Sequence, residues 1–366
     1  MSDPVPWLLL SVIPGVGTHR FQELLRRFGS PEHVLNASLS DLMTVPGLGP
    51  QIAGAITTHR NHAFVTRQIK LASRLGVDII TSHDEAYPAS LRQIYDPPPL
   101  LFVRGRVTEE DEHTLGIVGT RRVSSYGRRM TERFCSALCA AGITIVSGLA
   151  RGVDTIAHRT ALAQKGRTVA VLGSGLDIPY PPENLPLMEQ ITTSGAVISE
   201  YPMGTTPDAT NFPQRNRIIS GMSNGVLIVE AGESSGALIT ARYALEQDRE
   251  VFAVPGPLTC EGSRGTNKLI KEGTAKLVED VGDILEELGP AAVLNIPSHA
   301  EIREAHAFSL APEEKQLYKI ISETPQHIDR LATSSSLPSS TILNMLLNLE
   351  LKGAIRQLPG KMFVRE

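Results

Sequence analysis

The middle of this chain alternates short runs of β-branched and other apolar residues with segments of helical periodicity. The apolar runs are nearly continuous, as in strands buried on both faces of a parallel sheet. They lie at 114–118, 143–147, 168–172, 196–199, 225–229, 250–254 and, more weakly, 276–278. Helical segments at 126–141, 154–164, 185–193 and 237–247 separate them. Because parallel neighbours need right-handed crossovers, the pattern predicts an α/β fold with a doubly wound parallel sheet in residues 84–288.

Helical periodicity also occupies both ends of the chain. Residues 1–75 contain two copies of one hairpin, IPGVG at 13–17 and VPGLG at 45–49, each ahead of a predicted helix. These copies resemble paired helix-hairpin-helix units. Residues 289–310 have no clear period and contain Pro290 and Pro297, so we expect a linker there. In residues 311–366, helices predicted at 313–322, 327–332 and 339–351 precede strands at 354–358 and 361–365, the pattern of a winged helix.

The residues that follow the predicted strands form the candidate ligand site, because doubly wound sheets bind ligands beyond the carboxyl ends of their strands. Almost every such loop combines a glycine with a hydroxyl or a charge. Glycine lets the backbone approach a phosphate closely, and backbone N–H groups can donate to it. A single glycine loop can be a simple turn, but five at one sheet edge favour a phosphate ligand. The candidates are Gly119, Thr120, Arg121, Ser124, Ser147, Gly148, Arg151, Gly173, Gly175, Asn184, Ser235 and Gly236.

Two arginine clusters indicate what kind of phosphate ligand this is. Residues 119–129 hold four arginines and no acid, and NFPQRNR at 211–217 holds two more, again without an acid. In a chain whose net charge is −4, such local clusters are typical of a groove that follows a nucleic-acid backbone. We therefore expect Arg121, Arg215 and Arg217 to contact phosphates, with Asn216 beside them. Phe212 either stacks on a base or packs in the core.

Other classes of site lack their motifs. The strand-following loops contain no G-x-G-x-x-G fingerprint, Walker A lysine, G-x-S-x-G elbow or H-E-x-x-H pair, so we expect neither a cofactor nor catalysis. Asp154 and His158 lack a third metal ligand, which favours a local hydrogen bond over a metal site. The sequence has no signal-peptide pattern and no apolar run long enough to span a membrane, and its three cysteines form no CxxC pair. We expect a cytoplasmic protein without membrane contact.

Seven ordered segments form a set of family motifs. They read GTRRVSSYG at 119–127, SGLARGVDTIAH at 147–158, YPPEN at 180–184, SEYP at 199–202, FPQRNRIISG at 212–221, SGALIT at 235–240 and VPG at 254–256. The set resembles the DprA/Smf family over roughly residues 85–290. This resemblance implies an extended Rossmann-like domain that binds single-stranded DNA, forms a homodimer through its later part and helps load RecA on incoming DNA during transformation. It also implies that Arg121 takes a backbone phosphate. Some relatives place a lysine near the turn that here reads Pro182-Glu183.

Three alternatives remain open at this stage. The middle domain could be a nucleotide hydrolase of the lysine-decarboxylase-like type, although EAGESSGA at 230–237 departs from the P-G-G-x-G-T-x-x-E loop of that class. The tail could be a sequence-specific regulator, but its third helix presents Ser339, Ser340, Asn344 and Asn348 with no arginine or lysine before Lys352, which favours a protein contact. The two hairpins could donate N–H groups to DNA phosphates or serve as an interaction domain.

Overall fold

The computed structural model of the protein describes residues 2–289, 312–322, 326–335, 339–351, 355–358 and 360–365. The chain divides into two compact units, Met1–Asn295 and Ile296–Glu366. Of the linker predicted at 289–310, all but Gly289 lies outside the described residues.

Nine strands of the first unit form one sheet, in the order β1-β2-β6-β5-β4-β3-β7-β8-β9. The seven predicted strands are confirmed as β3 to β9, and all pairings among them are parallel. The strand order reverses between β3 and β7, so the topological switch point lies there. The strands are β1 Val77–Thr81, β2 Leu100–Gly105, β3 Thr114–Val118, β4 Thr144–Ser147, β5 Thr168–Val171, β6 Ala196–Ser199, β7 Gly225–Ile228, β8 Glu250–Ala253 and β9 Lys276–Leu277.

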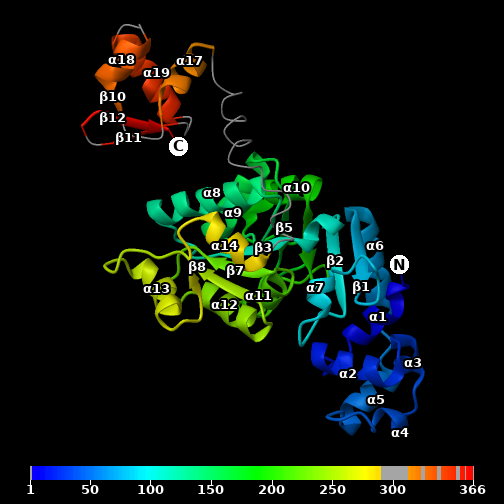
Figure 1. The fold of residues 1–366 in the computed structure, drawn as a ribbon. Helices are drawn as coiled ribbons and strands as arrows, with labels where there is room; N and C mark the ends of the chain where they lie inside the picture. Colours follow the sequence, from blue (N-terminus) through cyan, green and yellow to red (C-terminus); the bar gives the residue numbers. More distant parts are fainter. Residues whose placement is uncertain are drawn as a thin grey trace. The chain divides into compact units, whose positions relative to one another are not determined.

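Helices cover both faces of this sheet, and Figure 1 shows α8 and α9 on one side and α12 on the other. One face packs on α8, α9, α10 and α14, and the opposite face packs on α7, α11, α12 and α13. Within the described residues, no helix combines the length and the apolar composition needed to cross a membrane. The helices are α7 Ala89–Arg92, α8 Ser125–Ala140, α9 Val153–Ala163, α10 Leu185–Ser194, α11 Asn211–Gly221, α12 Ala237–Glu246, α13 Arg264–Lys271 and α14 Val281–Leu288, with single turns at Glu109–Glu112, Pro182–Asn184 and Glu261–Ser263.

Helix α8 illustrates why these segments are helical. Its N-cap is Ser124, whose Oγ accepts a hydrogen bond from the Gly127 N–H at 3.0 Å and so satisfies one unpaired donor of the first turn. Its buried residues Thr131, Phe134, Cys135 and Leu138 recur at spacings of three and four and therefore face the sheet together. Like Cys139 and Cys260, Cys135 is a free thiol.

The sheet begins earlier in the chain than the sequence predicted. β1 pairs antiparallel with β2, and β2 pairs antiparallel with β6, so the sheet is mixed at this edge and not purely parallel. The expected domain boundary at residue 84 is therefore wrong, because it separates β1 from β2. A single core also joins the two regions, since Trp7, Leu24 and Val65 belong to the same buried cluster as Phe102 and Leu172. The helical segment and the sheet share apolar surface and do not form separate cores.

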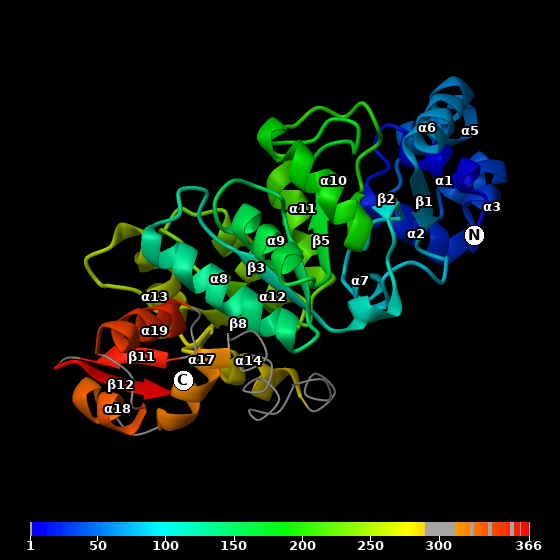
Figure 2. The same ribbon diagram turned by 90° about the horizontal axis from the view of Figure 1, so that it is seen from above.

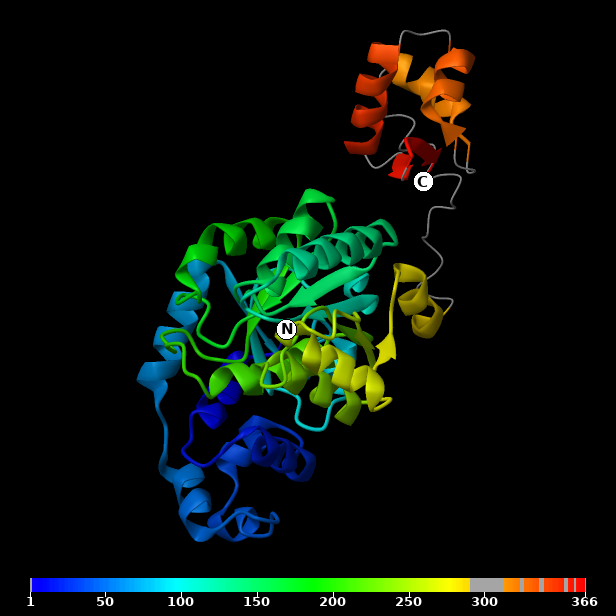
Figure 3. The same cartoon turned by 90° about the vertical axis from the view of Figure 1, so that its left-hand side faces the viewer.

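Six helices precede β1 and form the lobe drawn in blue in Figure 3. In the two predicted hairpins, Gly15 and Gly47 have φ values of +86° and +74°, a conformation that costs glycine little. The lobe is fixed to the sheet by Gln68 of α6, whose Nε2 donates to the Met203 carbonyl and whose Oε1 accepts from the Met203 N–H, both at 2.9 Å. The six are α1 Pro4–Ser11, α2 Thr18–Phe28, α3 Pro31–Asn36, α4 Leu39–Leu42, α5 Pro50–Thr58 and α6 His62–Leu75.

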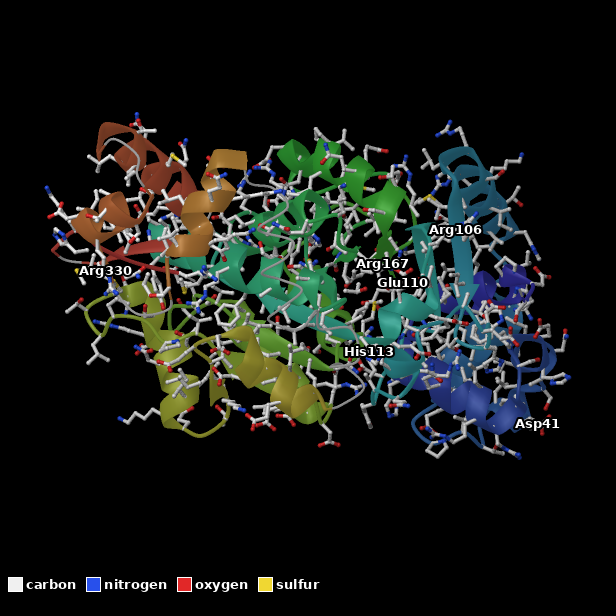
Figure 4. The ribbon with its side chains drawn as sticks, turned by 45° about the horizontal axis from the view of Figure 1, so that its top comes forward. Asp41, Arg106, Glu110, His113, Arg167 and Arg330 are labelled. Carbon is white, nitrogen blue, oxygen red and sulfur yellow. The ribbon has the colours of Figure 1, made fainter. Side chains whose placement is uncertain are left out.

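An ion pair at the amino ends of the central strands links the segment before β3 to the segment before β5. Arg167 precedes β5 and donates through Nε and Nη2 to the two carboxylate oxygens of Asp111, each at 2.7 Å. The Arg167 side chain lies close to Arg106 and Glu110 in Figure 4, and its Nη2 also donates to the Arg106 carbonyl. This edge is therefore held together by its own side chains, whereas the carboxyl edge is hollow.

The second unit is a winged helix with its own apolar core, which includes Leu317, Leu331, Ile342 and Phe363. Its three strands pair in the order β10-β12-β11. Among the described side chains of its third helix, those of Leu343, Asn344, Leu347 and Asn348 are exposed, whereas the side chains of Ser339 and Ser340 lie outside the described part. Pro359 of the wing turn lies outside the described residues. The elements are α17 Pro312–Ile320, β10 Gln326–His327, α18 Ile328–Ser335, α19 Ser339–Leu351, β11 Ile355–Leu358 and β12 Met362–Arg365.

Candidate nucleic-acid interface

A cavity of about 820 Å³ lies at the carboxyl edge of the sheet, beside the switch point between β3 and β7. We call it the sheet-edge pocket. Helices α11 and α12 both begin at its wall, and neither has a side-chain N-cap, so the positive ends of both helices border the cavity. The sequence-predicted residues that line it are Gly119, Thr120, Arg121, Phe212, Arg215, Asn216, Ser235 and Gly236.

The loop after β4 forms part of this site, and two of its N–H groups are already occupied. Asp154 Oδ2 accepts hydrogen bonds from the Gly148 and Ala150 N–H groups at 3.2 and 3.3 Å. Leu149 between them has a φ of +55°, which turns both donors toward the same acceptor. A carboxylate of the protein thus takes the Gly148 and Ala150 donors, and phosphate binding by the rest of this loop stays a prediction.

Arg215 supplies a buried positive charge under the pocket. It is 4% exposed, and its Nη1 donates to the carbonyls of Gly148, at 2.8 Å, and Val171. Its Nε is buried without a hydrogen-bond partner among the described residues. Burial lowers the pKa of the guanidinium to about 10, so Arg215 stays charged at neutral pH.

Burial acts in the opposite direction on the neighbouring carboxyl. It raises the pKa of Asp154 to about 6, although Arg215 and the two backbone donors partly offset the effect. His158 lies four residues further along α9, and burial lowers its pKa to about 3. The His158 Nδ1 atom lies 2.7 Å from Thr168 Oγ1, which itself donates to the Ile145 carbonyl. Asp154 and His158 are therefore engaged in separate hydrogen bonds, and the described residues contain no cluster of three metal-ligating side chains.

The rings of Phe212 and Tyr180 line one side of the sheet-edge pocket, and we call them the aromatic wall. The ring of Phe212 is half-buried and lies 5.5 Å from the ring of Tyr180, and the guanidinium of Arg121 lies 5.5 Å from the Phe212 ring centre. Gly173 lies beneath the ring, where an added Cβ would come within 3.0 Å of Phe212. Phe212 is therefore a wall of the pocket and not a core residue, and the lack of a side chain at Gly173 leaves room for it.

A second cavity of about 460 Å³ continues from the pocket between α8 and α9 and shares Arg121 and Arg122 with it. We call it the α8–α9 groove. Figure 2 shows these two helices side by side. Arg151 lines it and pairs with Glu183, and Arg128 and Arg159 add further cations. The pocket and the groove together are lined by six arginines and three carboxylates, which are Arg121, Arg122, Arg128, Arg151, Arg159, Arg215, Glu132, Asp154 and Glu183.

Several predicted site residues support the site from inside the fold. Ser147 is fully buried and donates to the Ile117 carbonyl at 2.6 Å. Asn184 is 2% exposed and donates through Nδ2 to Leu149 O and Thr155 Oγ1, both at 2.8 Å. Ser124 caps α8, and Gly175 is buried where a side chain would meet the Pro202 carbonyl. The expectation that the Ser147 side chain faces a ligand is therefore corrected, whereas Asn184 borders the α8–α9 groove with its amide N–H groups committed to the protein.

Arg217 is the clearest departure from the sequence prediction. It lies on the opposite side of α11 from Asn216 and borders a different cavity, next to the helical lobe. Its Nη2 donates to Glu200 Oε2 at 2.5 Å, and its Nε lies 3.2 Å from Asp96 Oδ2. The acids come from distant parts of the chain, so the acid-free segment 211–217 gave no sign of them. The guanidinium is 5% exposed and is committed to these carboxylates.

The same cavity bears on the two hairpins. It is lined by Gly17 and Gly47, by the carboxylates of Asp96 and Glu200, and by the guanidinium groups of Arg20 and Arg217. The charges around the hairpins therefore balance, and both roles of the hairpins, phosphate binding and protein interaction, stay predictions.

Comparison with known protein families shows three matches along the chain. The family described as DNA recombination-mediator protein A matches residues 78–289, the DprA winged helix domain matches residues 301–361, and a helix-hairpin-helix motif matches residues 8–67. The chain belongs to the DNA recombination-mediator protein A family.

Individual members of the family are similar to this chain in sequence and in structure. Protein Smf of Synechocystis is 34% identical over 395 residues, which covers 100% of this chain and 99% of the relative. The crystal structure of DNA processing protein A from Streptococcus pneumoniae is 34% identical with a TM-score of 0.63, and the match covers 75% of this chain and 99% of that one. DNA processing protein A from Helicobacter pylori, whose single-stranded DNA binding mode is described, is 31% identical with a TM-score of 0.52 over 57% of this chain and 98% of that one.

Sequence reasoning missed some of the residues that line the site in this family member. Arg159 follows His158 in a helical segment that carries no other arginine, so the local sequence did not distinguish it from a solvated cation. Tyr180 was assigned only to a turn. Both reach the site because α9 and the loop after β5 converge at the same sheet edge.

Proposed function

We propose that the sheet-edge pocket and the α8–α9 groove bind the phosphodiester backbone of single-stranded DNA. The observation that carries this proposal is the excess of arginines over carboxylates in two connected cavities of a chain whose net charge is −4. The two cavities have volumes of about 820 and 460 Å³, and their arginines come from the loops after β3 and β4 and from α8, α9 and α11. Neutralising several phosphates with arginines releases condensed cations from the strand, which is the main source of sequence-independent affinity.

The aromatic wall supports a single strand over a duplex. Phe212 and Tyr180 can stack on a base only when that base is unpaired. The uncharged outer face of α19 argues against major-groove recognition by the tail. The Helicobacter pylori relative, which binds single-stranded DNA, is consistent with this assignment.

The buried residues around the pocket hold its loops in place and do not contact the DNA in this proposal. Ser147, Asn184 and Gly175 fix the loops after β4, β5 and β6, and Arg217 fixes α11. Ser124 holds the loop after β3, since its N–H donates to Glu230 Oε2 at 2.9 Å.

Relatives named DNA processing protein support a DNA-processing role. Membership of a recombination-mediator family supports the further proposal that this role is exercised in transformation, in the cytoplasm, by passing the strand to RecA. The test is the rate of RecA filament nucleation on strands coated by single-strand binding protein, with and without this protein. An unchanged rate contradicts the RecA part and leaves DNA binding intact.

We also propose a homodimer through the later part of the sheet domain. Leu258 and Leu277 are 87% and 41% exposed, and Leu277 lies on the edge strand β9. Exposed leucines beside an open strand edge are suited to a self-complementary contact. Sedimentation of the wild type and of Leu258→Glu tests this, and a wild-type monomer at micromolar concentration contradicts it.

The central test is a fluorescence-anisotropy titration with a single-stranded oligonucleotide and with the duplex of the same sequence. We expect tighter binding of the single strand. Equal affinities, or a preference for the duplex, would contradict the proposal. Incubation with nucleoside monophosphates provides the test for the rival hydrolase, which would release free base.

A further inference from the structure

Helix α6 carries a basic face that none of the functions above employs. Arg67, Lys70 and Arg74 are exposed and recur at spacings of three and four, so they lie on one side of the helix. Together with Ala63, Thr66 and Leu71 they line a shallow groove of about 350 Å³ that contains no acid. We call this surface the α6 basic face.

The charges of this face are available to a ligand. Some other exposed cations of the first unit are paired with acids, for example Arg242 with Glu246 and Lys268 with Glu272. Within the described part of the chain, no ion pair or hydrogen bond engages the side chains of Lys70 and Arg74, and Arg67 contacts only the ring of Phe64, at 5.8 Å. Helix α6 itself has no acidic residue among its 14.

The opposite side of the same helix is tied to the carboxyl edge of the sheet. Gln68 forms its two buried hydrogen bonds with Met203, in the loop that follows β6. Four residues further along that loop, Pro207 lines the sheet-edge pocket. Because a chain extends by at most about 3.6 Å per residue, Met203 and Pro207 lie within about 14 Å of each other. The loop thus spans the interval between the pocket and α6, and Figure 2 places both helices α6 and α11 beside it.

We propose that the α6 basic face is a second contact for the DNA backbone, reached only by strands longer than those that fill the pocket. The inference rests on the proposed function. With a rise of 1.5 Å per residue, Arg67 to Arg74 span about 10 Å of helix. At about 3.4 Å per nucleotide in a stacked strand, this length matches two or three phosphates. The contact uses side-chain charge on the outer face of the lobe, and so differs from phosphate binding by hairpin N–H groups.

The test compares two oligothymidylates, one of about six nucleotides and one about three times as long. Three full-length proteins are titrated with each: the wild type, K70E/R74E and the control R26E/R27E. The control makes the same charge change on α2 of the same lobe, where Arg26 pairs with Glu23. All substituted side chains are exposed, and unchanged thermal unfolding confirms intact folding.

We expect K70E/R74E to bind the long strand about tenfold more weakly than the wild type at about 0.1 M salt, with a salt slope less steep by about 1.4. Its affinity for the short strand should equal that of the control. The proposal is overturned if K70E/R74E and R26E/R27E bind the long strand equally, since the α6 basic face is then only a solvated surface. A wild type that binds neither strand refutes the proposed function itself, and the two failures are thereby distinguished.

Discussion

Arg215 and Asp154 hydrogen-bond to opposite ends of one residue, Gly148. Arg215 Nη1 donates to the Gly148 carbonyl at 2.8 Å, and the Gly148 N–H donates to Asp154 Oδ2 at 3.2 Å. The two buried charges therefore fix the loop after β4 from both sides, and both border the sheet-edge pocket. A Cβ at Gly148 would come within 2.6 Å of the Arg215 guanidinium, so only glycine fits between them. The pocket contains a carboxylate that a bound phosphate must tolerate.

This arrangement predicts a pH dependence of DNA binding. The pKa of Asp154 is about 6, so the carboxylate becomes neutral as the pH falls from 7 to 5 and the pocket gains positive charge. Bound phosphates favour the protonated form, so affinity should rise over this range. One unit of further pKa increase in the complex corresponds to about tenfold tighter binding. Asp154→Asn should bind more tightly at pH 7 and lose this pH dependence. An affinity that falls on acidification would contradict the prediction.

The raised pKa of Asp154 also makes the free energy of unfolding depend on pH, with higher stability at low pH. Its folded pKa of about 6 exceeds the reference value of 3.8, so the folded state binds the proton more tightly. The stability that Asp154 contributes is fully present below pH 3.8 and is lost as the pH rises through about 6. Urea unfolding of the wild type and Asp154→Asn at pH 5 and pH 7 isolates this contribution.

Arg121 is one of two exposed arginines shared by the pocket and the groove, and its substitution should affect all DNA sequences alike. We expect Arg121→Ala to weaken single-strand binding about tenfold and to make the salt slope less steep by about 0.7, from a wild-type value near −3 for about four phosphates. The matched control is Arg242→Ala, which removes an arginine from the outer surface of α12. A wild-type slope near zero would be incompatible with a backbone-following groove.

Phe212 tests whether bases stack on the aromatic wall. Removing one stacking ring typically costs about 1–3 kcal/mol per base. Phe212→Ala should therefore weaken single-strand binding by that amount, with little change in salt slope because no charge is removed. Phe212→Tyr should bind nearly as the wild type does. If Phe212→Ala changed only the unfolding midpoint and not the affinity, the ring would be a structural element alone.

Arg217 should matter for stability and not for binding. Arg217→Ala leaves Glu200 buried without its partner, and burial already raises the pKa of that carboxyl. Loss of one member of a buried pair typically costs about 3–5 kcal/mol, whereas replacing both members by uncharged side chains costs less. The double variant E200Q/R217M should thus unfold at higher urea than Arg217→Ala. A folded Arg217→Ala that fails to bind DNA would restore the sequence-based assignment.

The domain limits predict which fragments bind DNA. A fragment of residues 1–295 contains the whole first unit and should retain most of the single-strand affinity, so removing the winged helix should cost less than Arg121→Ala does. A fragment that starts at residue 84 lacks β1 and most of the core that Trp7 and Leu24 share with Phe102, and should aggregate. Circular dichroism and anisotropy on both fragments check this, and a stable fragment 84–288 would contradict the shared core.

The sequence alone determined the features that depend on local pattern. β3 to β9 and the helices α8, α9, α10 and α12 follow from runs of buried apolar residues and from helical spacing, whereas α11 and α13 were not predicted. The glycine-rich loops after the strands follow from the rule that ligands bind at the carboxyl edge. Arg121 could be assigned to the site because it follows β3 directly. β1 was not predicted because it has only five residues and follows α6 directly, so the local pattern does not separate it from the helix. Its pairing with β2 is visible only in the tertiary structure.

Only the tertiary structure decided which charges face a ligand. Arg215 and Arg217 are two residues apart in one acid-free segment, yet α11 directs Arg215 toward the pocket and Arg217 toward Glu200 and Asp96. Those acids lie 17 and 121 residues away in the chain, so no local pattern could reveal them. Asp154 likewise belongs to the site because its loop folds around it. Electrostatic interactions depend on distance in space and on burial, and both are properties of the packed fold and not of sequence spacing.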